Sequence, residues 1–294
     1  RIRANQLLSA WKLLRGAMPQ GSFLGPLAFL TLIDDLVTGC PVHKYVDDTL
    51  SETLKSKQLN SSMATFIENL LNWAEQNDMQ LNTSKTKEMV LGPLARSNLP
   101  LLSTPVGIIE RVSSFKLLGV HIDSTLCWSL HVDNIVRKTT QRLYFLKQLK
   151  RAGLSSNQLF HYYKAVIRPV LEYCVPVWHY ALTKAQTEQL EAVQKRAIHI
   201  ILNFSRGMPY SFMLSASDLS SLANRREDIS RKFFLDISDP ASCLYHLLPE
   251  PRETSLTSRL RTYEKFPRVF TRTKRYCSFI QYALNHYQDR MSNQ

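Results

Sequence analysis

The sequence has 294 residues, of which 44% are hydrophobic, so it is long enough for two or three packed units with buried cores. Its 37 Lys and Arg residues against 24 Asp and Glu residues give a formal net charge of +13, which favours a polyanionic partner, nucleic acid before an anionic membrane surface. Five widely separated cysteines argue against a disulfide framework, and the longest nearly apolar run, residues 23–33, is too short to span a bilayer. We therefore expect an intracellular protein of a reducing compartment, neither secreted nor inserted into a membrane.

Residues 19–22, PQGS, predict a turn that leads into a helix. Gly21 adds no side-chain bulk, and the free N–H groups of a helix N-terminus suit phosphates or a nucleotide. Gln20 adds a donor and an acceptor for a base or a sugar. Ser22 is the expected N-cap and Pro26 lies in the first turn. Apolar residues then recur at helical spacing: Phe23, Leu27, Leu30, Ile33 and Leu36.

Residues 44–49, KYVDDT, place two adjacent carboxylates shortly after an aromatic ring. Neighbouring side chains on a strand point to opposite faces, so Asp47 and Asp48 converge only where the strand bends into a tight hairpin. Two like charges repel each other unless a cation neutralises them, and Mg²⁺ is a hard ion that prefers carboxylate and phosphate oxygens. The alternative is an acidic, solvated turn. The other doublet, Asp34 and Asp35, ends a predicted helix and is interpreted as structural or solvated.

The rest of the first 123 residues predicts a second amphipathic helix and short strands. The helix is indicated by Leu59, Met63, Phe66, Ile67, Leu70 and Ala74. Strand-like pieces follow at 88–91 and 115–122. This pattern predicts an α+β fold in which helices pack on one face of a small antiparallel sheet.

From Trp128 onward the apolar pattern is wholly helical. The first stripe consists of Val132, Ile135, Thr139, Leu143, Leu146 and Leu149. Six basic residues fall mostly outside this stripe: Arg137, Lys138, Arg142, Lys147, Lys150 and Arg151. They indicate either a solvated helix face or a surface that binds a polyanion. Apolar stretches at 159–167, which Pro169 kinks or ends, and at 190–201 complete a predicted helical bundle. The remainder, from about Ser205, is basic and predicted to be helical.

Four segments in this order resemble the palm of a reverse transcriptase of a LINE-type non-LTR retrotransposon. They are PQGSFLGPL, KYVDDT, LNWAEQNDMQLNTSKTKEM and FKLLGVHID. The segments RLYFLKQLKRAGLSSNQLFHYYKAVIRPVLEYCVPVW and LEAVQKRAIHII resemble the helical thumb and the part that follows it in such elements. The resemblance implies a partial palm over 1–123, an all-α thumb over 124–204 and a basic helical C-terminal segment over 205–294.

The resemblance implies an RNA-directed DNA polymerase. Such an enzyme extends a DNA primer on an RNA template from deoxynucleoside triphosphates, using two Mg²⁺ ions, with Mn²⁺ as the alternative ion. Asp47 matches the family's metal-ligating first acid and Asp48 its supporting neighbour, so both are expected to be catalytic and metal-binding. Tyr45 matches the aromatic residue beside the primer terminus and the incoming nucleotide.

Further site residues follow from the same resemblance. The loop that contacts template and nucleotide is matched by Gln20, Gly21 and Ser22. Lys85 falls where the family carries a lysine proposed to protonate the pyrophosphate, although a solvated lysine explains it equally well. Leu118 and Gly119 match the turn of the hairpin that grips the primer. The six basic residues of 137–151 would then follow the duplex backbone.

The chain departs from the family pattern in two ways. Val46 stands where most LINE-type enzymes carry Ala, and the family's first catalytic Asp precedes the PQGS loop on a strand upstream of Arg1. We therefore expect a fragment without fingers and with part of the metal site, incompetent for catalysis as this truncated chain. The alternatives are a catalytically dead nucleic-acid-binding remnant and a relic without function. The resemblance also implies a ribonucleoprotein of the nucleus and cytoplasm.

Overall fold

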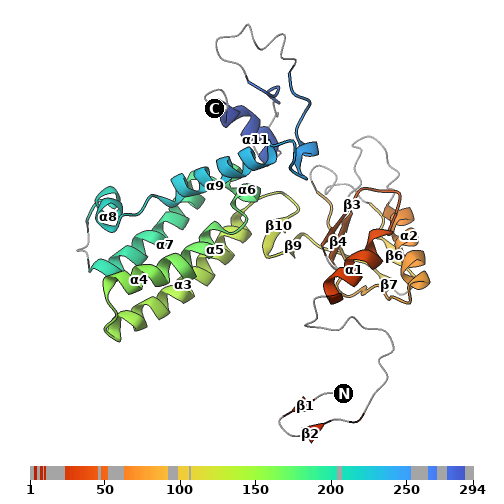
Figure 1. Ribbon diagram of the computed structural model, residues 1–294, viewed down its shortest axis with the longest axis horizontal. Helices are drawn as coiled ribbons and strands as arrows, with labels where there is room; N and C mark the ends of the chain where they lie inside the picture. The colour runs from red at the N-terminus through yellow and green to blue at the C-terminus, as the bar shows by residue number, and fades with distance from the viewer. Residues whose placement is uncertain are drawn as a thin grey trace. The chain divides into compact units, whose positions relative to one another are not determined.

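The structure is a computed structural model that describes residues 3–4, 7–8, 10, 24–45, 48–51, 63–91, 99–105, 107–203, 207–252, 264–269 and 277–288. The chain divides into two compact units, Arg1–Val112 and Ser113–Gln294 (Figure 1).

The described residues of the first unit contain two helices, both where the apolar spacing predicts them. Helix α1 spans Leu24–Asp34, with Pro26 in its first turn. Of its predicted stripe, Ile33 is buried, whereas Leu27 and Leu30 are 59% and 50% exposed. Helix α2 spans Met63–Gln76 and buries Phe66, Ile67 and Ala74. Phe66 and Ile67 pack with Ile109 to form the core of this unit.

The expected single antiparallel sheet is not formed by the described residues of the first unit. The strands are β1 (Arg3–Ala4), β2 (Leu7–Leu8), β3 (Val42–Tyr45), β4 (Asp48–Ser51), β5 (Lys87–Glu88), β6 (Ser103–Thr104), β7 (Gly107–Ile108) and β8 (Glu110–Arg111). They form separate two-stranded ladders, β1–β2, β3–β4, β6–β7 and the parallel pair β5–β8. Strands of two to four residues present few backbone groups on their free edges, so a wide ladder does not propagate. The mixed α+β class is confirmed.

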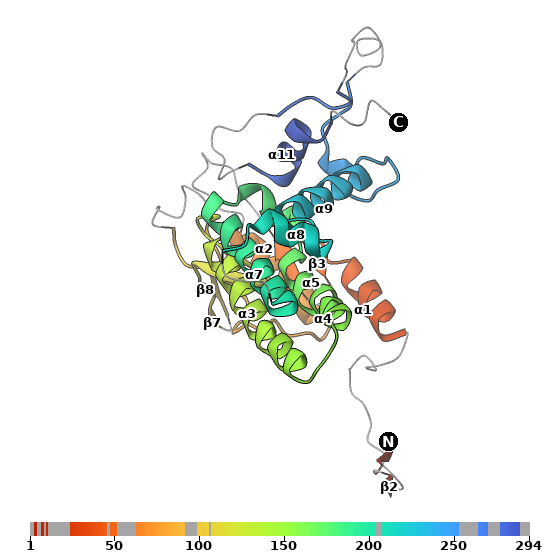
Figure 2. The same cartoon turned by 90° about the vertical axis from the view of Figure 1, so that its left-hand side faces the viewer.

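Helices dominate the second unit. It begins with a hairpin of β9 (Ser114–Leu117) and β10 (Val120–Asp123). The helices are α3 (Ser129–Arg151), α4 (Ser156–Tyr162), a π-helical turn (Tyr163–Ile167), α5 (Arg168–Glu172), α6 (Val175–Trp178), a 3₁₀ turn (His179–Ala181), α7 (Lys184–Leu202), α8 (Tyr210–Ser217), α9 (Leu222–Ile237), a 3₁₀ turn (Tyr245–Leu247) and α11 (Phe279–His286). Helices α3, α4, α5 and α7 lie side by side in both views (Figures 1 and 2).

The apolar stripes predicted from the sequence form the core of this bundle. The buried residues include Val132, Ile135, Leu143 and Leu146 from α3 and Leu190, Val193, Ala197 and Ile201 from α7. Pro169 does not end the helical segment, because α5 includes it and continues to Glu172. The backbone immediately before α5 forms a π-helical turn that ends at Ile167. A second cluster, Phe234, Ile237, Phe266 and Leu284, joins α9 to α11.

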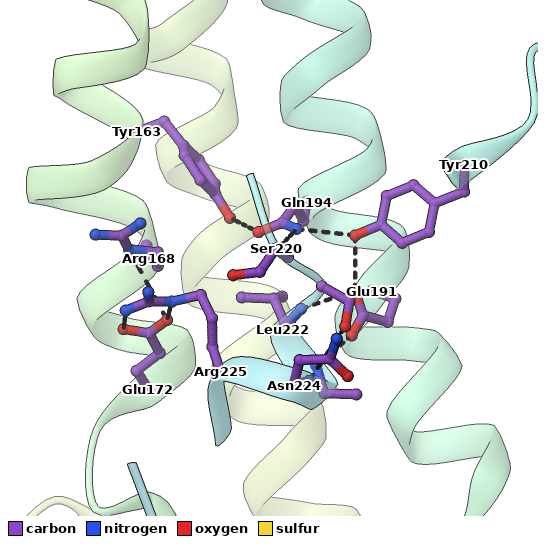
Figure 3. A network of polar contacts seen from close by, with 12 residues as sticks. Tyr163, Arg168, Glu172, Glu191, Gln194, Tyr210, Ser220, Leu222, Asn224 and Arg225 are labelled. Atoms are coloured by element: carbon purple, nitrogen blue, oxygen red, sulfur yellow. Dashed lines mark hydrogen bonds and ion pairs between the residues drawn. The ribbon is translucent and has the colours of Figure 1, made fainter. Parts of the chain in front are cut away.

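A polar network fixes the start of α9 on the bundle (Figure 3). The Glu191 carboxylate of α7 accepts the backbone N–H of Leu222 at 3.2 Å and of Ala223 at 2.6 Å, so it caps the N-terminus of α9. It also accepts the Tyr210 hydroxyl at 2.6 Å. The Gln194 amide donates to that hydroxyl at 2.9 Å. Burial and the nearby Glu191 raise the pKa of Tyr210, which therefore stays a neutral donor.

Candidate metal and nucleic-acid site

The KYVDDT segment forms the predicted hairpin. Strands β3 and β4 are antiparallel, with Tyr45 opposite Asp48 and Lys44 opposite Thr49. Because opposite residues share a face of the ladder, Tyr45 and Asp48 lie on one face and Lys44 and Thr49 on the other. Val46 and Asp47 connect the strands in sequence and lie outside the described residues.

Lys44 ties the hairpin to the end of α1. Its ammonium group donates to the carbonyl of Ile33 at 2.7 Å and to that of Asp34 at 2.9 Å. These carbonyls are at the C-terminal end of the helix, where a cation is favourable. The Lys44 face therefore packs toward α1, and the opposite face presents Tyr45, 61% exposed, and the exposed Asp48.

Asp48 suits a hard divalent cation by its donor chemistry. Its exposed carboxylate follows Asp47 directly in the sequence, and carboxylate oxygens are the ligands that such ions prefer. The part of the chain that the structure describes contains no cluster of three or more His, Cys, Asp or Glu residues able to hold a metal. Among the described residues of the hairpin, Asp48 supplies an exposed carboxylate of the kind that divalent cations bind.

The remaining predicted residues of the first unit are differently placed. Gln20, Gly21 and Ser22 lie outside the described residues. Lys85 is exposed in a turn, where its backbone N–H donates to Asn82 at 3.1 Å. In the other acid pair, the Asp35 carboxylate accepts the Trp73 indole N–H at 2.8 Å, in agreement with a structural interpretation.

In the second unit, Leu118 and Gly119 form the turn of the β9–β10 hairpin, as predicted. Both have positive φ, 45° and 91°, as a two-residue type I′ turn requires. The Tyr173 hydroxyl donates to the Leu118 carbonyl at 2.7 Å. A Cβ at position 119 would lie 3.2 Å from the Tyr173 ring. The ring of Tyr173 therefore holds this turn.

We expect Gly119→Ala to lower the free energy of unfolding by about 1–2 kcal/mol, because alanine is strained at this φ and its methyl group presses on Tyr173. Gly153→Ala is the matched control, since Gly153 also has a positive φ of 85° but nothing within 4 Å of an added Cβ. Urea denaturation of both variants separates the backbone strain, which both variants share, from the Tyr173 contact, which only Gly119→Ala makes. Equal losses in the two variants would show that the Tyr173 contact adds nothing.

The six predicted basic residues of α3 divide into two groups. Arg142 donates to the carbonyl of Val166 in the π-helical turn, and Lys150 donates to the carbonyls of Ile200 and Ile201 at the end of α7. These two cations are therefore occupied inside the bundle. The exposed ones are Arg137, Lys138, Lys147 and Arg151, and none of them forms an ion pair among the described residues.

Comparison with known proteins identifies the segment that contains both hairpins. Residues 4–122 match the family model described as reverse transcriptase (RNA-dependent DNA polymerase). These residues are a reverse transcriptase domain. The match confirms the resemblance read from the four ordered motifs.

The domain is similar to polymerases of mobile elements. The chain is 26% identical over 208 residues to the "RNA-directed DNA polymerase from mobile element jockey" of Drosophila melanogaster, covering 66% of this chain and 22% of that protein. It is 23% identical over 216 residues to the "Probable RNA-directed DNA polymerase from transposon BS" of the same species, covering 68% of this chain and 24% of the relative. The jockey protein of Drosophila funebris is 19% identical over 281 residues, covering 91% of this chain and 30% of that protein. The chain thus spans less than a third of these relatives, whose kinship confirms a LINE-type reverse transcriptase.

The remaining findings concern the helical part of the chain, solved structures and membrane spans. Residues 128–168, which follow the reverse transcriptase domain, match a model described as Alkylated DNA repair protein alkB homolog 8, N-terminal. No solved structure is significantly similar to the chain. Among the described residues, no helix has both the length and the apolar character needed to cross a membrane.

The sequence interpretation missed three aromatic residues of the second unit. Tyr173 lies 55 positions from Leu118, so its contact with the hairpin turn has no local signal. Tyr144 and Phe145 are 58% and 56% exposed on α3. Their position off the Val132–Leu149 stripe was readable from helical spacing and would have marked them as surface residues.

Proposed function

We propose that this chain belongs to an RNA-directed DNA polymerase that extends a DNA primer on an RNA template. The observation that carries the proposal is the match of residues 4–122 to reverse transcriptases, which includes a hairpin with Tyr45 and Asp48 on one exposed face. The relatives' names state the same activity for those proteins.

In this proposal Asp47 and Asp48 hold Mg²⁺ at the β3–β4 turn, with Mn²⁺ as the alternative ion. When bound, two such ions activate the primer hydroxyl and neutralise charge on the leaving pyrophosphate. Tyr45 contacts the incoming deoxynucleoside triphosphate from the same hairpin face. Lys85, exposed and positively charged, is the proposed proton donor to the pyrophosphate. Gln20, Gly21 and Ser22 contact template and nucleotide.

The second unit would hold the nucleic acid. The turn at Leu118 and Gly119, braced by Tyr173, contacts the primer strand. The four exposed cations of α3 supply sequence-independent attraction to phosphates. In the cell, the protein is proposed to act inside the nucleus and cytoplasm as a ribonucleoprotein.

The proposal is tested by sequencing the transcript upstream of the codon for Arg1 and assaying the protein that this transcript encodes. We expect DNA synthesis on a primed RNA template that requires Mg²⁺ and stops when the ion is chelated. A DNA template of the same sequence serves as comparison. Absence of synthesis from folded protein under these conditions would contradict the proposal.

The exposed cations also favour a second candidate, a nucleic-acid-binding remnant without catalysis. Its affinity for an RNA–DNA duplex should fall steeply with salt, and Lys147→Gln should reduce the slope of log K against log salt by about 1. Fluorescence anisotropy across a salt series measures this slope. Lys195→Gln on the exposed face of α7 is a control of equal charge change. A slope unchanged by Lys147→Gln would show that Lys147 of α3 does not contact the duplex, and would contradict the use of α3 as the binding surface.

A further inference from the structure

The outer face of α3 carries two aromatic side chains that the bundle leaves in solvent. Tyr144 and Phe145 are 58% and 56% exposed, and their rings meet edge to face with centroids 5.7 Å apart. The helix lies at an outer edge of the bundle, with its stripe of Val132, Leu143 and Leu146 buried on the other side (Figure 1). An exposed aromatic pair adds nothing to this core, so its role must be sought in a partner.

Cations surround this pair along the helix. Arg137 and Lys138 lie two turns before Tyr144 and Phe145, respectively, so each cation shares a row with one ring. Arg151 lies two turns after Tyr144. All three are exposed, as is Lys147 between them.

Negative charge is scarce on the same helix. Asp133 is the single acid between positions 129 and 151. Its carboxylate accepts the Gln189 amide of α7 at 3.1 Å. Arg196 is exposed two turns after Gln189, and therefore lies on the side of α7 that faces α3. The surface beside the rings is thus strongly basic, which selects a polyanion as the partner.

We infer that the face formed by Arg137, Lys138, Tyr144, Phe145, Lys147 and Arg151 binds single-stranded nucleic acid by stacking unpaired bases on the two rings. Cations alone are sufficient for the phosphates of a duplex, but base faces inside a duplex are covered by their neighbours. Aromatic rings interleaved with cations are the combination that single-stranded sites use. The inference rests on the proposed use of α3 as a nucleic-acid surface and assigns it to an unpaired strand.

The test measures binding of the full chain to a short unstructured RNA strand, to the DNA strand of the same sequence and to an RNA–DNA duplex. We expect the double substitution Tyr144→Ala, Phe145→Ala to weaken single-strand binding by about tenfold or more, because each lost stack has a substantial cost. Duplex affinity should stay nearly unchanged, because the phosphate contacts of the four cations remain. Comparison of the two single strands reports whether RNA or DNA is preferred.

Two controls keep the result specific. Tyr144→Phe retains the ring and should bind like the wild type, whereas Phe212→Ala removes a ring that is 50% exposed on α8 and should have no effect. Circular dichroism verifies that each variant folds. Equal losses for single strand and duplex, or no loss for either, would overturn the inference.

The outcome is separable from that of the proposed polymerase. Ring-dependent single-strand binding by a protein without primer extension supports the inference and contradicts the polymerase proposal. Primer extension by a protein whose single-strand binding is unchanged when both rings are removed supports the polymerase proposal and contradicts the inference.

Discussion

Asp47→Asn should lower Mg²⁺-dependent primer extension by about 100-fold or more in the protein encoded by the complete transcript. Under the proposed function, this carboxylate holds the ion that supplies several kcal/mol of transition-state stabilisation, and an amide is neutral and a weaker ligand. The measurement is the single-turnover rate of nucleotide addition at saturating primer and template, so that a change in nucleic-acid affinity does not enter. Raising the Mg²⁺ concentration should recover little of the rate.

The chain offers a matched control in its other acidic doublet. Asp34 is exposed at the end of α1, and its neighbour Asp35 is held by Trp73. Asp34→Asn removes the same charge from the same unit and should leave the rate within about twofold, because surface charges act weakly at a distance in salt. A similar loss in Asp34→Asn and Asp47→Asn would refute a specific role for the KYVDDT doublet.

Acidification should destabilise the second unit through His131. This side chain is 2% exposed and lies edge to face against Trp128 and Trp178. Its Nδ1 accepts the backbone N–H of His121 at 3.3 Å, so it links α3 to the β9–β10 hairpin. Burial, with smaller contributions from His121 and Lys138, lowers the pKa of His131 to about 4.

Because this folded-state pKa lies below the unfolded value of 6.5, protonation favours unfolding. The neutral ring's contribution to stability is complete above pH 6.5 and is lost as the pH falls toward 4. The loss between pH 7.5 and pH 5 should be about 2 kcal/mol. Urea denaturation at several pH values measures it.

His131→Gln provides the critical comparison for this prediction. Glutamine keeps an oxygen acceptor for the His121 N–H and does not titrate, so stability should fall less steeply with acidification. His161→Gln, at an exposed position on α4, should retain the wild-type dependence. Identical pH profiles for His131→Gln and the wild type would assign the acid sensitivity to other groups.

Sequence pattern was most informative where a local rule acts. The stripes of α3 and α7 specify buried faces through helical spacing, and the structure buries them as predicted. The KYVDDT and FKLLGVHID segments predict hairpins, and both hairpins form. The family was also readable, because four short motifs in order carry the chemistry of a polymerase site.

Sequence pattern failed where distant segments meet. Arg142 and Lys150 are indistinguishable in sequence from the other cations of α3, yet they satisfy carbonyls near 166 and 200. A helical face becomes occupied or free only when the neighbouring helices are placed, so four of the six cations stay exposed. The short strands likewise were expected in one sheet, and those that the structure describes form separate pairs instead.

The sequence by itself determined the family, the helical bundle and the acidic hairpin, because spacing and turn chemistry act over a few residues. Only the tertiary structure decided which side chains are available at the surface. It brought Tyr173 onto the turn of the β9–β10 hairpin, turned Lys44 toward α1 with Asp48 on the opposite face, and left Tyr144 and Phe145 exposed among exposed cations of α3. The physical reason is that exposure and hydrogen-bond partnership are properties of packed neighbours, and those neighbours lie tens of residues away in the chain.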